Sequence, residues 1–267
     1  MKTKLLLCIV VLTFSNLSKA ETVLNAPEYK PLNNVRVSMQ RMLRSTEGSY
    51  FLSLYAGILN PHATLYDIDK DKIINLKGLQ RGTQLNLKSV DSDDVINKTY
   101  QLSGIFDANS GDFKGILTEG EDTLGKPIQF EPAIKVSDKP YFILKFYGLE
   151  DIQQPYGSVL KRVDIVNKNN VTQALTGFTA FPKSIGYMDV NFDGYYDIIL
   201  SDISEKRTIQ DKRYIYWIFN PQTRQFQRSP QLEKIVGFPK LRGDKQQIDF
   251  GNGQLYQVEK GLLSRTE

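Results

Sequence analysis

The feature that most constrains the fold is a series of short strand-like runs separated by segments of turn length. Runs of about four to six residues, rich in aromatic and β-branched side chains, are typical of strands and too short for stable helices. They predict an antiparallel meander or small barrel within residues 21–136. The runs are Tyr50–Tyr55, Ala63–Tyr66, Lys72–Leu76, Gln84–Lys88, Thr99–Ser103, Asp112–Leu117 and Pro127–Phe130.

Two further segments of this half carry a local prediction. The run Asp107–Gly111 combines Asp, Asn, Ser and Gly and predicts a tight turn between two of the strands. The run Val35–Leu43 has an apolar pattern that suits either a short helix or a strand, so both remain open.

The second half, residues 137–267, is also rich in strand-like runs. The run Tyr214–Phe219 is apolar throughout, which predicts a strand that is central in a sheet and a buried Trp217. An Asn220–Thr223 turn follows it, and Gly251–Gly253 predicts a hairpin further on. We therefore expect an all-β protein whose second domain is sandwich- or propeller-like.

The first twenty residues have the pattern of a secretory signal peptide. Lys2 and Lys4 precede the apolar run Leu5–Leu12, and Ser18-Lys19-Ala20 provides small residues before a cleavage point at Glu21. The run is too short to span a membrane, and no later segment approaches the necessary length. The sequence thus predicts a periplasmic protein without a transmembrane segment in the mature chain.

Removal of residues 1–20 changes both charge and cysteine content. The 34 Lys and Arg residues fall to 31 when the three lysines of the signal are lost, against 30 Asp and Glu. This balance gives no support for nucleic-acid binding. The only cysteine, Cys8, is also removed, so the mature chain depends on its own core rather than on disulfides.

The segment between Asp189 and Asp197 reads DVNFDGYYD and predicts a calcium-binding loop. Ca²⁺ takes six to eight oxygen ligands, and side chains at positions 1, 3, 5 and 9 of such a loop can supply four of them. Here a glycine at position 6 allows the positive φ that reverses the loop. The predicted ligands are the side chains of Asp189, Asn191, Asp193 and Asp197 and the carbonyl of Tyr195. The alternative is an Asn-Phe-Asp-Gly turn without metal.

A second, weaker pattern lies at Asp67–Asp71, where Asp67, Asp69 and Asp71 occupy positions 1, 3 and 5. Lys72 stands where a glycine would be needed, and an adjacent ammonium disfavours a cation. A polar hairpin turn is therefore the default interpretation, and a second metal site stays open.

Catalytic patterns are weak, and we expect no enzymatic activity. His62 is the only histidine, and nothing near it resembles a nucleophile elbow. Glu119, Glu121 and Asp122 form an acidic cluster flanked by glycine, which is typical of a solvated hairpin tip. A phosphate-binding glycine motif is also missing from the sequence.

Several elements occur together between Val159 and Phe226. A strand at Leu160–Val166 and a run around Gln173 precede the NFDG loop, and the pattern YxYWxFNPxTxxF begins at Tyr214. Together they resemble bacterial periplasmic proteins of the lysozyme-inhibitor type. That group includes immunity proteins against peptidoglycan-degrading toxins delivered by type IV or type VI secretion systems. The resemblance covers about a quarter of the chain.

This resemblance implies a β-rich domain, a structural Ca²⁺ in the loop and no catalysis by the protein itself. It also implies a partner, a cell-wall hydrolase effector of lysozyme or amidase type, which the protein would inhibit. The alternative is a calcium-stabilised envelope-surface or glycan-binding module. The charged segment Ser204–Arg213 is either a solvated loop or part of a partner-binding surface.

Overall fold

The computed structural model describes residues 29–57, 60–90, 99–122, 124–150, 156–204 and 206–266. Strands dominate these residues, which confirms the all-β prediction. The predicted signal peptide, residues 1–20, lies outside the described residues. In the described part of the chain, no helix is long and apolar enough to cross a membrane.

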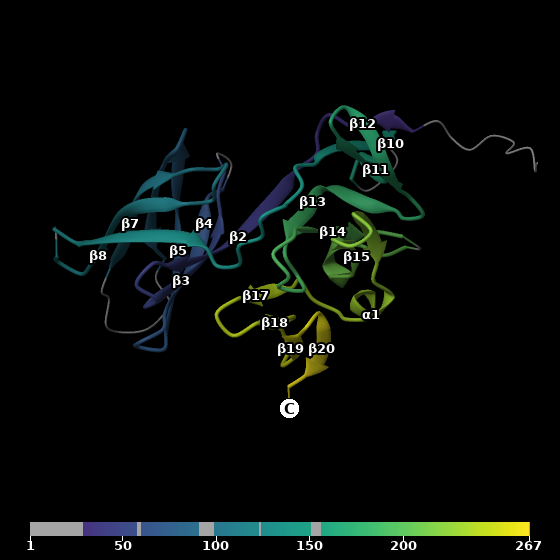
Figure 1. Ribbon diagram of the computed structural model, residues 1–267. Helices are drawn as coiled ribbons and strands as arrows, with labels where there is room; N and C mark the ends of the chain where they lie inside the picture. The colour runs from purple at the N-terminus through teal and green to yellow at the C-terminus, as the bar shows by residue number, and fades with distance from the viewer. Residues whose placement is uncertain are drawn as a thin grey trace, which may run out of the picture.

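The first part is an eight-stranded antiparallel barrel (Figure 1). Each strand pairs with the next along the chain, and the last pairs with the first to close the barrel. This is the closed form of the predicted meander. The strands are β2 (Val37–Ser45), β3 (Tyr50–Tyr55), β4 (His62–Asp67), β5 (Lys72–Arg81), β6 (Gln84–Ser89), β7 (Tyr100–Phe106), β8 (Phe113–Glu119) and β9 (Lys126–Pro132).

The interior of the barrel is filled by apolar side chains. Alternate residues of a strand point to opposite faces, and the inward ones form one buried cluster dominated by leucine and phenylalanine. Gly104 and Gly115 lie opposite each other in β7 and β8, and a Cβ on either would come within 2.8 Å of the Phe113 ring. These glycines leave the space that Phe113 fills. Eight strands give an interior just wide enough for such packing.

The undecided run at residues 35–43 is largely strand β2, and it belongs to two sheets. Residues Gln40–Arg44 pair with β3, whereas Val37–Met39 pair in parallel with β13 (Ala180–Met188). Figure 1 shows β2 extending from the barrel to the second part of the molecule. The barrel and the second part therefore share a continuous backbone hydrogen-bond network.

The second part contains β13 and seven further strands. In a first group, β10 lies between β1 and β11, and β11 also pairs with β12 and β13. In a second group, β13, β14, β15 and β16 pair in that order. The remaining bounds are β1 (Lys30–Pro31), β10 (Ile143–Glu150), β11 (Ser158–Asn167), β12 (Asn170–Leu175), β14 (Asp197–Asp202), β15 (Tyr214–Asn220) and β16 (Gln225–Arg228), with short helices η1 (Ile209–Asp211) and α1 (Pro230–Glu233).

Strand β14 is buried over its whole length because it lies between two cores. Ile198 and Leu200 pack into the cluster on one face, and Ile199 packs into the cluster on the other. Strand β15 is central, as predicted, because it pairs with β14 and β16. The expectation of a buried Trp217 is only partly met, because the side chain is half-buried against the first of these clusters.

A small four-stranded sheet packs mainly on the second part, where its buried side chains share one apolar cluster with Ile199 and Tyr216. It also contacts the barrel. The Arg242 guanidinium carbon lies 5.1 Å from the centroid of the Tyr66 ring, and Gly243 lies directly against Phe51. The predicted hairpin around Gly251–Gly253 joins two strands of this sheet. The strands are β17 (Lys240–Arg242), β18 (Gln247–Asp249), β19 (Leu255–Glu259) and β20 (Leu262–Arg265).

Candidate functional site

The predicted calcium loop connects β13 to β14, as the flanking apolar residues indicated. Gly194 has φ +90°, the positive value that the sequence pattern predicts for the glycine of this loop. A Cβ at Gly194 would lie 2.6 Å from Cγ1 of Val136, so the connector between the barrel and β10 packs on the loop. Side chains of Val190 and Phe192 anchor the loop in the neighbouring core.

Backbone N–H groups organise the carboxylates of this loop. Asp189 Oδ1 accepts from the N–H of Asp193 at 3.0 Å, and its Oδ2 accepts from the N–H of Gly194 at 2.8 Å. Asp193 Oδ1 accepts from the N–H of Tyr195 at 2.9 Å, while the Asn191 side-chain amide donates to its Oδ2 at 2.8 Å. The first, third and fifth residues of the predicted set thus come together.

Asp197 has a different environment from the other predicted ligands. It is completely buried, and its two oxygens accept from the N–H groups of Val190 at 2.8 Å and Phe219 at 2.9 Å. It thereby joins the start of the loop to β15. The side-chain hydroxyl of Tyr195 donates to Asp138 Oδ1 at 2.7 Å.

The loop concentrates negative charge in a poorly solvated place. Burial raises the pKa of Asp189 to about 7, and the nearby Asp193 carboxylate acts in the same direction. Burial also raises the pKa of Asp197, with Asp189 as the next contribution. The Lys139 ammonium lies 3.5 Å from the centroid of the Tyr196 ring, and burial of that ammonium lowers the pKa of Lys139 to about 8 against the attraction of Asp189.

Two observations bear on whether these residues suit a metal. Within the described residues, no group of three or more His, Cys, Asp or Glu side chains is placed to hold a metal ion together. On the other hand, Asn191 Oδ1 is buried and receives no hydrogen bond in the described part of the chain. An unpartnered amide oxygen beside Asp189 and Asp193 is the donor chemistry that Ca²⁺ takes. Asp189, Asn191 and Asp193 are therefore the residues that could hold Ca²⁺, whereas both oxygens of Asp197 accept backbone hydrogen bonds.

The second candidate, Asp67–Asp71, forms the turn between β4 and β5. Asp67 Oδ1 accepts from the N–H of Lys70 at 3.1 Å, and the Lys70 ammonium lies 3.3 Å from both Asp67 and Glu119. A lysine of the turn therefore provides the positive charge next to Asp67. The default interpretation of a polar hairpin turn describes this geometry.

The outer surface of the barrel holds a feature that no sequence motif indicated. We define the barrel face as the outward positions that the pairing register aligns across all four strands β5, β6, β7 and β8. Strands β7 and β8 lie on the side away from the second part in Figure 1. By the pairing register these positions form three rows across the four strands. The rows are Lys77, Lys88, Gln101 and Thr118; Leu79, Asn86, Ser103 and Ile116; and Arg81, Gln84, Ile105 and Lys114.

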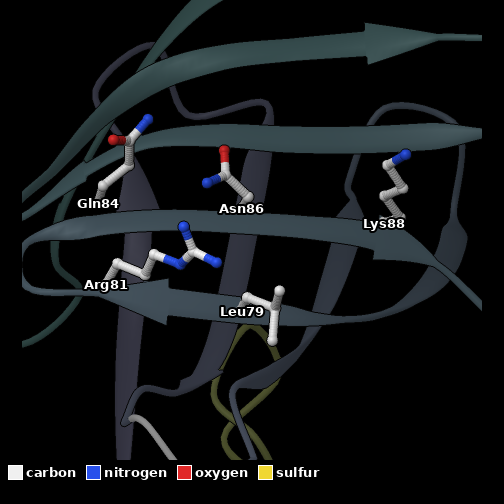
Figure 2. Close-up of a pocket in the computed structure, with 5 residues that line it drawn as sticks. All are labelled: Leu79, Arg81, Gln84, Asn86 and Lys88. Carbon is white, nitrogen blue, oxygen red and sulfur yellow. The ribbon is translucent and has the colours of Figure 1, made fainter.

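The barrel face is basic and partly apolar. Four of its residues are Lys or Arg and none is acidic, whereas the whole chain has 34 Lys and Arg against 30 Asp and Glu. Leu79, Ile105 and Ile116 are exposed by 63%, 52% and 46%. A depression of about 420 Å³ is lined by side chains of β5 and β6, and Figure 2 shows all of them projecting from the same side of the two strands. They are Leu79, Arg81, Gln84, Asn86 and Lys88.

Sequence reasoning missed this face because its signal is distributed over four strands. Each strand alone shows only ordinary alternation of apolar and polar residues. The clustering of basic residues becomes visible once the register places the strands side by side.

Comparison of the chain with protein-family models, with curated proteins and with solved structures finds no match.

Proposed function

We propose that this protein is a periplasmic, non-catalytic binding protein that inhibits a peptidoglycan-degrading enzyme. In this role it would act as an immunity protein against a toxin delivered by a type IV or type VI secretion system. The observation that carries the proposal is the barrel face: exposed leucine and isoleucine side chains among polar ones are characteristic of a surface that meets another protein. The resemblance over Val159–Phe226 adds the class of partner.

The barrel supports binding through its exterior. Its interior is filled by the leucine and phenylalanine cluster, so a small ligand would have no room there. Paired strands also fix the backbone from which the outward side chains project, so association would need little backbone ordering. Inhibition then follows from physical blockage of the enzyme rather than from any reaction of this chain.

We assign the loop at Asp189–Asp197 a supporting role in the same proposal. A Ca²⁺ ion held by Asp189, Asn191 and Asp193 would neutralise their charge. Since the connector bearing Val136 and Asp138 packs on this loop, the ion would stiffen the region between the barrel and the second part. It would contribute stability and no chemistry.

The test uses cells that carry a wall-degrading toxin directed to the periplasm. The full chain should protect them, and a chain lacking residues 1–20 should not, because it would stay on the wrong side of the inner membrane. The purified protein should leave peptidoglycan intact. Cleavage of peptidoglycan by the purified protein, or equal protection by the shortened chain, would overturn the proposal.

A second candidate function is glycan binding beside the loop. A depression of about 300 Å³ there is lined largely by amide side chains together with Asp193. Amides pair well with sugar hydroxyls, so muropeptide fragments titrated into the purified protein test this alternative. Binding that is lost in Gln222→Ala but kept in barrel-face variants would favour the glycan-binding module over the inhibitor. The amides are Asn191, Asn220, Gln222 and Gln227.

A further inference from the structure

We propose that the barrel face is the docking surface for a carboxylate-bearing surface of the partner protein, with Lys77, Lys88 and Arg81 as the charged contacts and Leu79 as the apolar one. The identity of that partner as a wall-degrading enzyme rests on the proposed function. The placement of the contacts rests on the register and exposure of β5 and β6.

The strongest observation is a pair of like charges. Lys77 and Lys88 are directly opposite each other in β5 and β6, and both are exposed. Like charges at directly opposite positions destabilise a sheet. In the described part of the chain, neither lysine has an ion pair, and the next residue in their row is Gln101. A carboxylate from outside would relieve this repulsion.

The depression next to this pair can receive a side chain of the partner. Side chains of β5 and β6 line it, and Leu79, exposed by 63%, is the apolar residue among them. Arg81 stands two residues from Leu79 on the same face, and its guanidinium can bind a carboxylate through two parallel hydrogen bonds. Gln84 and Asn86 add amide donors opposite them.

Charge and composition favour an acidic protein over other occupants. A second copy of this chain would present the same basic face in a symmetric dimer, and the two faces would repel each other. Proteins that bind single-stranded nucleic acid stack bases on aromatic side chains, and none of the twelve outward positions of the face is aromatic. Exposed Leu79, Ile105 and Ile116 instead suit an apolar contact surrounded by complementary charge.

The first experiment measures binding of a decaglutamate peptide by calorimetry and by amide chemical shifts. The variant Lys77→Glu/Lys88→Glu keeps the like-charge pair but reverses its sign, so its fold should be as stable as the wild type. The matched control, Lys30→Glu/Lys183→Glu, makes the same change of charge at exposed positions of β1 and β13. We expect affinity to fall at least about tenfold in the first variant and to change little in the second.

When the peptide binds to the wild type, the changes in amide chemical shift should map to residues of β5 and β6. Equal losses in the two variants, or shifts centred elsewhere, would overturn the docking surface. Tighter binding of heparin or single-stranded DNA than of the peptide to the same face would overturn the assignment of an acidic protein.

The second experiment tests purified peptidoglycan-degrading enzymes of lysozyme and amidase type and measures their inhibition by the full chain. Inhibition by the wild type that persists in Lys77→Glu/Lys88→Glu would refute the docking surface and leave the proposed function intact. Peptide binding at the face without inhibition of these enzymes would refute the proposed function and leave the docking surface intact. Loss of inhibition only in the barrel-face variant supports both.

Discussion

At the level of single residues, Gln173 shows how one side chain can replace a missing strand pairing. Its amide donates to the Phe226 carbonyl at 2.7 Å, and its carbonyl accepts from the Phe226 N–H at 2.8 Å. It thus completes the outer hydrogen bonds of β16 from strand β12. The sequence resemblance included this residue, but only the structure shows what it does.

Gln173→Leu should destabilise the protein by about 1–3 kcal/mol, because it leaves a partly buried N–H and C=O without partners. Urea unfolding followed by tryptophan fluorescence measures this as a lower midpoint with an unchanged slope. Gln225→Leu, an exposed glutamine of the same region, is the control and should have little effect. Similar midpoints for the two variants would contradict the bridging role.

The calcium proposal predicts a melting temperature that rises with calcium and falls with a chelator. An ion that binds only the folded state adds about 2.7 kcal/mol at a hundredfold excess over Kd. Asp193→Ala should abolish the response, whereas Asp69→Ala, in the exposed β4–β5 turn, should retain it. The melting temperature of each protein is measured by thermal unfolding in excess calcium and in excess chelator. Identical curves for the wild type in both conditions would remove Ca²⁺ from the loop.

At the level of elements, the sequence predicted most strands because alternation is a local pattern. Strands β3 to β9 and β15 follow runs that are visible in a few consecutive residues. Strand β2 was undecided because its pattern suits either structure, and pairing with β3, β9 and β13 selects the strand. The barrel face was not predictable for the same reason, since it depends on the register between strands.

The pair Lys77 and Lys88 of β5 and β6 predicts that a substitution which weakens binding of the acidic partner can stabilise the fold. Lys77→Glu alone would replace a repulsive pair by an attractive one with Lys88, so it should stabilise the protein by about 0.2–1 kcal/mol. Thermal unfolding at low and high salt should show the gain shrinking as salt screens it. A destabilised Lys77→Glu would mean that the lysines are not neighbours as the register places them.

At the level of the whole molecule, neighbouring apolar clusters share strands. Strand β2 contributes to the barrel core and to the cluster under the small sheet, and β14 contributes to both clusters of the second part. The candidate loop could be placed from the sequence, because its oxygens are close together in the chain. The connector packed on it could not, since Val136 and Gly194 are distant in sequence and meet only through tertiary packing. The same holds for Phe51 against Gly243.

This shared packing predicts one unfolding transition rather than two. The only tryptophan, Trp217, reports on the second part, while far-ultraviolet circular dichroism reports on all strands. Because β2 pairs with strands on both sides, the two signals should give the same midpoint in urea. Separate midpoints would show that the parallel pairing of β2 with β13 contributes little cohesion.

The double membership of β2 also limits how this chain can be divided. A gene fragment ending at residue 136 would carry β2 without β13, and the complementary fragment would leave β13 with an open parallel edge. Each half would then present unpaired backbone N–H and C=O groups along an open strand edge, a surface prone to aggregation. The two parts are therefore poor candidates for separate exchange between proteins by recombination.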